Sequence, residues 1–435
     1  MTQAASAAVY PGARKDSLAF ILFAGAAAFS AYFAMYAFRK PFTAATYADV
    51  GGWTFAIDFK VALVIAQLVG YALSKFIGIK VVSEMSAARR GLAIVGLIAL
   101  SWLALVLFAL LPVQAKPLAM LLNGLPLGMI WGLVFAYLEG RRSSEVLASI
   151  LCASFILSSG LVKSVGAWLM ADWQVDEMWM PATTGMLFMP VLLVSVLGLS
   201  RLPPPSAEDI AERVARPPVD ATDRREFLRA YGPGIALLVL AYVVFTVIRD
   251  FRDNFAAEIW AGLGYGKSAA IFTASEVPIA VVTLVILASL VAVRDNRRAL
   301  VVIHLIILAG AVLIGASTLA FSLGWLPPVG WMIASGLGLY LAYTPFNAML
   351  FDRLIAASGR AGTAAFLIYI ADASGYAGSL MLLLLRNLPG VTVDWLTFYI
   401  ALALTGAGAS VILMLASMWH FKHRFKKAEH FHIER

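Results

Sequence analysis

Long apolar runs recur along the whole of this 435-residue sequence. A helix needs roughly 20 mostly apolar residues to cross the hydrocarbon of a bilayer, and these runs reach that length. Hydrophobic residues make up 61% of the chain and charged residues only 13%, a balance that is rare in water-soluble domains. We therefore expect an all-α polytopic membrane protein.

Twelve runs are long enough to be transmembrane helices. They lie at 17–47, 57–79, 91–111, 117–138, 145–170, 181–200, 233–256, 268–293, 299–322, 329–350, 361–385 and 394–419. The first run could instead be a signal peptide, but it continues to a charged pair and many more spans follow it. The prediction is therefore two six-helix halves.

A polar, proline-rich break separates the halves. We expect a six-helix bundle over 1–200, a cytoplasmic linker over 201–232, a second bundle over 233–420 and a basic cytoplasmic tail over 421–435. Residues 206–216 could form a short interfacial helix, but we favour a plain cytoplasmic linker.

The basic residues of the loops predict the orientation. If the N-terminus is cytoplasmic, that side holds most of them, including Arg89, Arg90 and the basic tail, and the opposite side holds only Lys116, Lys267 and Arg386. Cytoplasmic loops of membrane proteins are enriched in lysine and arginine. Both termini are therefore expected in the cytoplasm, with the chain in a bacterial inner membrane.

Seven basic residues lie within the apolar runs rather than in loops: Arg39, Lys40, Lys60, Lys75, Lys163, Arg249 and Arg252. An ionised side chain inside the bilayer costs several kcal/mol unless it is paired or faces water. Lys60 is near a span end, where snorkelling or a structural ion pair would explain it. For Lys40 we expect a partner across the two halves, Asp253 or Asp250. An excess of buried positive charge indicates an anionic ligand, since two arginines can hold a phosphate or carboxylate with paired hydrogen bonds.

The first span of each half carries a polar face centred on an arginine. Offsets of −7, −3 and +4 from that arginine keep one face of a helix. The face consists of Tyr32, Tyr36, Arg39 and Thr43 in the first half and of Tyr242, Thr246, Arg249 and Asp253 in the second. An alternative alignment pairs Arg39 with Arg252, which could then be a gate residue. Repeated halves with a site between them are typical of transporters.

The remaining polar groups leave two roles open. Glu276 and Asp372 could each carry a proton or serve as a counter-ion for a nearby arginine, and Lys163 has Ser159 one turn before it on its face. The chain has no GxxxxGK[ST] loop and no cluster with metal-ligand spacing, so we expect no ATP-driven step, no cofactor and no metal. No nucleophile–base pair supports an enzyme, and nothing indicates nucleic-acid binding.

Several motifs resemble those of a known family. The first span contains Y-F-x-x-Y-x-x-R-K-x-F, the second contains S-K-F at 74–76, and the loop after it contains S-E-x-S-x-x-R at 83–89. A-G-T-A-A at 361–365 is followed by G-Y-x-G-S at 375–379. Together with the two six-span halves, these motifs resemble the organophosphate:phosphate antiporter branch of the major facilitator superfamily.

The resemblance implies roles for individual residues. It assigns phosphate binding to Arg39 and Arg249 and a site-lining role to Lys75, with Tyr32 and Tyr36 on the same face. The histidine that the family has in its fifth span has no counterpart in this sequence. Lys163 lies nearby instead, and Asp372 is also unusual for the family.

We expect a secondary active transporter of a small organic anion, such as a phosphate ester, that works as a monomer by alternating access. Anion exchange and proton symport through Asp372 or Glu276 both fit the sequence. Lys40, Asp253 and Arg252 are expected to act in coupling or gating. The alternatives are a sensor of the same fold that binds its ligand without turnover, and a drug or sugar transporter of that fold.

Overall fold

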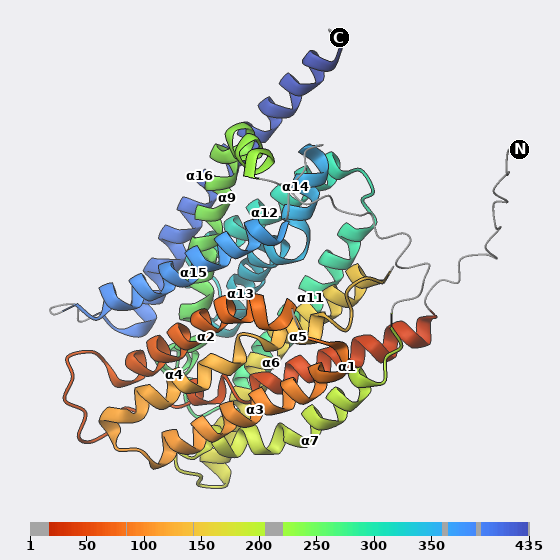
Figure 1. Ribbon diagram of the computed structural model, residues 1–435. Coiled ribbons are helices and arrows are strands. Elements are labelled where there is room, and N and C mark those ends of the chain that lie inside the picture. The colour runs from red at the N-terminus through yellow and green to blue at the C-terminus, as the bar shows by residue number, and fades with distance from the viewer. Residues whose placement is uncertain are drawn as a thin grey trace, which may run out of the picture.

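The computed structural model describes residues 17–83, 85–141, 143–204, 221–358, 364–388 and 393–433. Within these ranges every regular element is helical (Figure 1). Residues 206–216, Glu84 and 361–363 were part of the sequence argument and lie outside the described residues.

The first half contains seven α-helices and two short 3₁₀ turns. They are α1 (Leu18–Tyr36), η1 (Pro41–Ala44), α2 (Phe59–Ser83), α3 (Ala87–Leu110), η2 (Val113–Ala115), α4 (Lys116–Leu127), α5 (Ile130–Phe135), α6 (Ser144–Asp172) and α7 (Met180–Ser200). The predicted fourth span is thus divided into α4 and α5 beside Pro126, because proline removes a helical hydrogen bond and crowds the preceding turn.

The second half contains α9 (Ala221–Asn254), α10 (Ala256–Gly262), α11 (Ile271–Val291), α12 (Asn296–Ser322), α13 (Pro328–Pro345), η3 (Phe346–Leu350), α14 (Phe351–Ser358), α15 (Ala364–Arg386) and α16 (Trp395–Ile433). The predicted tenth span changes at Pro345 into the single π-helical turn η3. Eleven helices in the described residues are long and apolar enough to cross a bilayer, and α13 is the predicted span that is not among them.

Three predicted boundaries need correction. Helix α1 ends at Tyr36, so the prediction that it continues regularly through Arg39 and Lys40 is wrong. Helix α9 begins at Ala221, which places the end of the predicted linker inside a helix. Helix α16 continues to Ile433, so the predicted basic tail is an extension of the last helix.

The halves meet most extensively at two helix pairs, with smaller contacts of η1 with α10 and of α6 with η3. Helix α6 packs against α11, and α2 packs against α15, whereas most other helix pairs lie within one half. Figure 1 shows the helices of the first half crossing the lower part of the view and those of the second half rising behind and above them.

The two ends of the helix bundle are named from α1. The terminal side is the side of the molecule on which α1 begins, and the distal side is the side on which α1 ends.

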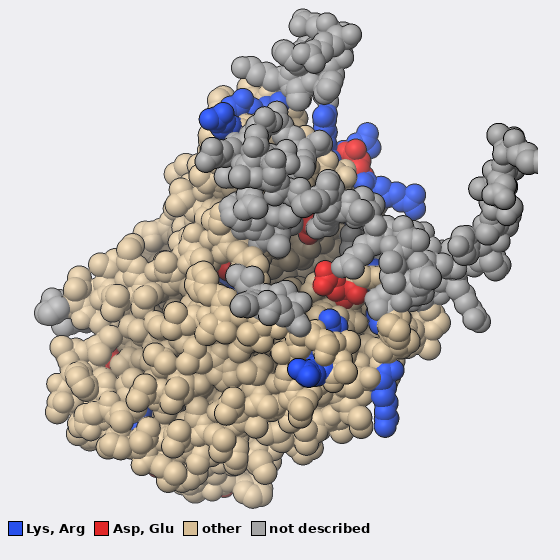
Figure 2. Space-filling model, viewed as in Figure 1, with Lys and Arg blue, Asp and Glu red and all other residues tan. Residues whose placement is uncertain are grey.

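The outer surface is apolar over a wide belt. The face shown in Figure 2 is almost free of charged side chains across its lower and left parts, and the charged groups gather toward the upper right. Large apolar side chains stand exposed on several helices, among them Leu92, Leu100, Leu103, Val194, Val285 and Ile412. Such a surface is stable against lipid tails, so the chain is an integral membrane protein.

Close helix packing depends on glycine at two crossings. A Cβ atom on Gly124 of α4 would lie 2.3 Å from the carbonyl oxygen of Gln67 in α2, and one on Gly70 would lie 2.2 Å from that of Leu121. Gly310 and Gly338 bring α12 and α13 together in the same way. Small residues let membrane helices approach until their backbones touch, which fixes the position of α2 beside α4.

Candidate substrate-binding site between the halves

Six of the seven basic residues within the spans have an acidic partner in the structure. Arg39 is the exception, since no carboxylate of the described residues contacts its guanidinium group, and its buried Nε atom has no hydrogen-bond partner. An unpaired cation inside a membrane protein is costly and marks a functional position.

The backbone around Arg39 explains how a charged residue reaches this place. Pro41 has no N–H group, so the regular helix cannot continue, and residues 37–40 form tight turns before η1 begins. Two side-chain amides replace the lost helical bonds. Asn123 Nδ2 donates to the Phe38 carbonyl at 3.0 Å, and Gln67 Nε2 donates to the Arg39 carbonyl at 2.9 Å. The same Gln67 nitrogen donates to Asn123 Oδ1 at 2.7 Å, so one polar pair fixes the position of Arg39.

Tyrosine rings surround the Arg39 guanidinium. Its Cζ atom lies 3.8 Å from the centre of the Tyr71 ring and 5.8 Å from that of Tyr36. Tyr32 packs edge-on against Tyr36, with ring centres 5.6 Å apart. Aromatic faces attract a cation without neutralising it, so the guanidinium keeps its charge and its free N–H groups.

Arg249 takes a related position on α9. Its guanidinium bonds to Asp250 Oδ1, with Nη2 at 2.7 Å, and its Cζ lies 4.2 Å from the centre of the Tyr343 ring. The second oxygen of Asp250 accepts a hydrogen bond from Ser379 of α15 at 2.8 Å. Arg249 thus contacts a tyrosine ring in the second half as Arg39 does in the first.

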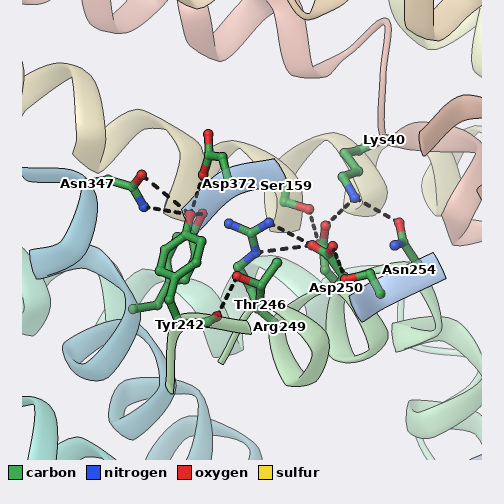
Figure 3. Close-up of polar contacts among 12 residues, drawn as sticks. Lys40, Ser159, Tyr242, Thr246, Arg249, Asp250, Asn254, Asn347 and Asp372 are labelled. Atoms are coloured by element: carbon green, nitrogen blue, oxygen red, sulfur yellow. Dashed lines mark hydrogen bonds and ion pairs between the residues drawn. The ribbon is translucent and has the colours of Figure 1, made fainter. Parts of the chain in front are cut away.

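Lys75 completes the positive region from α2. Its Nζ pairs with Asp372 Oδ2 of α15, and Tyr242 donates a hydrogen bond to the other carboxylate oxygen at 2.5 Å. The Tyr242 hydroxyl also lies 3.0 Å from the Tyr343 hydroxyl and accepts a hydrogen bond from Asn347 Nδ2 at 3.2 Å; Figure 3 shows Tyr242 with Asp372 and Asn347. Of the two roles that the sequence left open for Asp372, that of counter-ion for an arginine is wrong, because its ionic partner is a lysine of the other half.

A second polar cluster lies nearer the distal side, around Asp253. Lys40 Nζ lies 2.5 Å from one carboxylate oxygen and Lys163 Nζ 2.5 Å from the other, which also accepts a hydrogen bond from Ser159. Lys40 donates in addition to Asn254 Oδ1 at 2.8 Å. The predicted contact between Lys40 and Asp253 is confirmed, and Figure 3 shows Arg249 and Asp250 lying along α9 between this cluster and Tyr242.

Lys60 forms a third link between the halves. It is buried and binds both carboxylate oxygens of Glu258 in α10 at 2.6 and 2.8 Å. Its ammonium also donates to the Thr43 carbonyl at 3.0 Å. This is the structural ion pair considered from the sequence. The alternative prediction, that Lys60 snorkels to the membrane interface, is wrong. Glu258 lies beyond the span of α9, and its burial raises the pKa of the carboxyl group while Lys60 opposes that effect.

Arg252 and Glu276 pair within the second half. Arg252 Nη1 donates to Glu276 Oε1 at 2.6 Å, and Nη2 donates to the Met332 carbonyl at 3.1 Å. Glu276 is thus the counter-ion of an arginine, which is one of the two roles that the sequence left open. Both side chains are buried away from Arg39, so the structure gives Arg249, and not Arg252, the aromatic contact that resembles that of Arg39.

The predicted polar face holds in the second half only. Tyr242, Arg249 and Asp253 all contribute to the clusters because α9 is a continuous helix. In the first half the chain leaves the α-helix at Tyr36, and the Thr43 hydroxyl bonds to the Lys40 carbonyl at 2.8 Å instead of continuing the face.

Three site residues were missed from the sequence: Tyr71, Tyr343 and Asn347. Asp250 was considered as a partner of Lys40, whereas it binds Arg249. Tyr71 lies four residues before Lys75, and this spacing on one helix face could have indicated it. Tyr376 stood in the G-Y-x-G-S motif without an assigned role. It lies within electrostatic range of Arg39, Lys75 and Arg249.

Charge sign separates the two halves at these links. The lysines Lys40, Lys60, Lys75 and Lys163 come from the first half, and the carboxylates that they bind come from the second. The links lie on both sides of the Arg39 region, since Lys60 begins α2 near the distal side and Lys75 lies toward the terminal end of that helix. This arrangement can hold a small anion between the halves and close it off from either side.

The fold is that of the major facilitator superfamily, as comparison with solved structures shows. The nucleoside transporter NupG matches with a TM-score of 0.60 and 14% identity, over 93% of this chain and 99% of that one. A peptide transporter, POT, in complex with sulfate matches with a TM-score of 0.62 and 15% identity, over 94% and 95%. A D-xylose–proton symporter matches with a TM-score of 0.60 and 14% identity, over 92% and 96%.

The chain belongs to the family described as a family of unknown function (DUF5690), which matches residues 41–424. No curated protein matches the sequence.

Proposed function

We propose that the protein is a secondary active transporter of a small organic anion. The observation that carries this proposal is the Arg39 guanidinium, which lies across the Tyr71 ring at 3.8 Å with no acidic partner in the described residues. A ligand with negative charge would supply the missing counter-ion, and the planar guanidinium can bind a carboxylate or phosphate with two parallel hydrogen bonds.

The charge balance of the region supports an anion over a neutral ligand. Arg39, Arg249 and Lys75 contribute three positive charges, while Asp250 and Asp372 contribute two negative ones. Among these five residues one positive charge is therefore left over. Because charges in the membrane interior are expensive, this excess is best explained by a substrate that brings a negative charge with it.

The two sets of links support a mechanism of alternating access. The pairs at Lys60 and Asp253 hold the halves together toward the distal side, and the pair of Lys75 with Asp372 does so toward the terminal side. Breaking one set while the other persists exposes the site to one side at a time, as in transporters whose repeated halves rock about a fixed site.

The proposal also covers the substrate class, the mode of coupling, the membrane and the oligomeric state. The motifs of the first two spans favour a phosphate ester as substrate and exchange against another anion as one mode of coupling. The basic loops favour a bacterial inner membrane with both termini in the cytoplasm, and a monomer is sufficient because one chain supplies both halves of the site.

The test is an uptake screen in proteoliposomes with inorganic phosphate, glycerol 3-phosphate, glucose 6-phosphate, lactate and succinate. The wild type is expected to transport at least one of these anions. Arg39→Lys keeps the charge but loses the guanidinium plane, so uptake is expected to fall at least tenfold, about 1.4 kcal/mol in the barrier.

The matched control is Arg386→Lys. Arg386 also stacks on an aromatic ring, with its Cζ 3.4 Å from the centre of the Trp395 ring, but it lies at the distal end of α15 outside the site. Undiminished uptake by the Arg39→Lys variant contradicts the proposed anion site. Saturable binding without any flux would favour a sensor, and flux of a neutral sugar that survives loss of Arg249 would favour a sugar transporter.

A further inference from the structure

The contacts of Asp372 point to a proton-binding role for its carboxylate. We propose that Asp372 holds Lys75 while the site is empty and takes up a proton when the substrate anion replaces it on Lys75. This inference rests on the proposed transport function and makes the transport a proton–anion symport.

The empty site satisfies Asp372 completely. One carboxylate oxygen pairs with the Lys75 ammonium and the other accepts a hydrogen bond from Tyr242 at 2.5 Å. The two charged side chains are 23% and 15% exposed, so neither is sealed within the protein. The link can therefore open without passing through a dry, fully buried state, and a proton can reach the carboxylate.

Lys75 and Arg39 share one aromatic neighbour. The Lys75 Nζ lies 5.6 Å from the centre of the Tyr71 ring, and the Arg39 Cζ lies 3.8 Å from the centre of the same ring. Tyr376 lies beside them, 5.9 Å from Tyr71 between ring centres and 4.9 Å from Lys75 Nζ. An anion that binds Arg39 is thus next to the lysine that Asp372 holds, and the two negative groups compete for one cation.

The other groups that face Asp372 are uncharged. Tyr242 of α9 reaches it directly, and behind Tyr242 stand Tyr343 and Asn347. Arg249, also on α9, already has Asp250 as its partner. Helix α14, which also packs against α15, carries Asp352 and Arg353; Asp352 is exposed, and Arg353 bonds to Asn296 of α12. Lys75 is therefore the cation on which the charge of Asp372 depends.

The exchange can be written with its charges balanced. In the empty site Lys75 is positive and Asp372 negative. When a monoanion binds to Arg39 and Lys75, the Lys75–Asp372 pair breaks and the freed carboxylate oxygen takes a proton from water on the open side. A carboxylate left ionised between apolar helices without its cation would be costly, which drives this protonation. Release of the anion on the other side returns Lys75 to Asp372 and expels the proton there.

The other carboxylates between the halves do not fit this role. Asp253 is bound by two lysines and a serine, so losing one lysine would leave it paired. Glu276 pairs with Arg252 inside the second half, away from the Arg39 ring contacts. Asp250 also has a single cation, Arg249, but both belong to α9, and Ser379 holds its second oxygen. Asp372 differs from the others because its single cation comes from the other half and also borders the proposed anion site.

The experiment compares proton and anion movement in the same proteoliposomes. Pyranine inside reports lumen acidification after glycerol 3-phosphate or lactate is added outside at equal pH, and radiolabelled anion reports uptake. The wild type is expected to move one proton with each anion. Asp372→Asn keeps the hydrogen bond from Tyr242 and is expected to exchange labelled anion across the membrane with at least a tenfold smaller proton signal. The wild type and Asp372→Asn are given the same anion, so any proton that the anion itself binds or releases contributes equally to both pyranine signals.

Glu258→Gln is the matched control, since it also neutralises a carboxylate that binds a lysine of the first half. It is expected to keep the ratio of protons to anions. Equal proton-to-anion ratios in the wild type and Asp372→Asn overturn the coupling role while leaving anion transport standing. No flux of any anion by the wild type overturns the transport function and this inference with it.

A second measurement covers the case in which Asp372→Asn does not fold. An acid-outside pH gradient is expected to drive wild-type accumulation of lactate at least several-fold above the value without a gradient, and Asp372→Glu, which keeps a carboxyl group, is expected to do the same. Accumulation that ignores the gradient in both proteins contradicts the proposal.

Discussion

Asp253→Asn is expected to open the distal side. The substitution keeps the shape of the side chain but removes the one carboxylate that binds both Lys40 and Lys163. Breaking a buried ion pair by removing one partner costs about 3–5 kcal/mol. The lower end applies to this site because Lys40 still bonds to Asn254 and Lys163 still bonds to the backbone carbonyl of residue 253, and because Asp253 is 16% exposed.

The free-energy cost of losing these ion pairs destabilises only the conformation in which the distal side is closed. Both lysines belong to the first half and Asp253 to the second, so the bonds exist only while the distal side is closed. A loss of about 3 kcal/mol shifts the ratio of distal-open to distal-closed molecules roughly a hundredfold, since 1.4 kcal/mol corresponds to a factor of ten.

Double electron–electron resonance measures the distance between two spin labels and can therefore report the ratio of distal-open to distal-closed molecules. Spin labels at Trp173 and Leu323, both exposed on distal connections, are introduced in a Cys152→Ser background that removes the single native cysteine. Asp253→Asn should convert much of the short-distance population into a longer one.

Asp250→Asn is the control for that measurement. It removes a carboxylate from the same helix, but Asp250 binds only Arg249 and Ser379 of its own half, so no link between the halves is lost. If the two variants give the same distance distribution, the distal links do not hold the closed state and the reasoning fails.

Three further results are expected. The pKa of Glu258 is raised in the folded state above its ordinary value of 4.5, so the unfolding temperature in detergent should fall as the pH rises from 4.5 through the folded-state pKa. Glu258→Gln should remove this pH dependence, and an unchanged pH dependence in the variant refutes the prediction. Gly124→Ala should destabilise by about 1–3 kcal/mol because its Cβ meets the α2 backbone, whereas Gly96→Ala, with nothing within 4 Å, should not; equal unfolding temperatures would exclude the close approach. Asn123→Leu should weaken anion binding in a thermal-shift titration at least tenfold by releasing the Phe38 carbonyl, and an unchanged affinity would show that this amide does not fix Arg39.

The sequence predicts the helices well because hydrocarbon thickness sets one length for all of them. It fails where the backbone leaves the α-helix for a local reason. Pro41 and Pro345 were both visible in the sequence, yet an apolar run continues past each, and apolar content alone does not show that the helix stops. The bonds that replace the lost helical ones, such as that from Asn123 to the Phe38 carbonyl, come from another helix and leave no local signal.

The candidate site was predictable in part. Charged residues stand out in an apolar run, so Arg39, Lys75 and Arg249 could be found without any structure. Their partners depend on which helices touch, and sequence spacing does not give that information. The pairing of Lys75 with Asp372 joins α2 to α15, and Tyr343 was missed because a single tyrosine in a membrane helix is ordinary.

The segregation of charge between the halves has a consequence for biogenesis. The chain is made from its N-terminus, so Lys40, Lys60, Lys75 and Lys163 enter the bilayer before the carboxylates that bind them have been synthesised. Until α9, α10 and α15 are inserted, the first bundle carries these ammonium groups on its inner face without their carboxylate partners. The second bundle therefore acts as an assembly partner that neutralises the first, and a truncated first bundle would be recognisable to quality-control proteases by its exposed positive face.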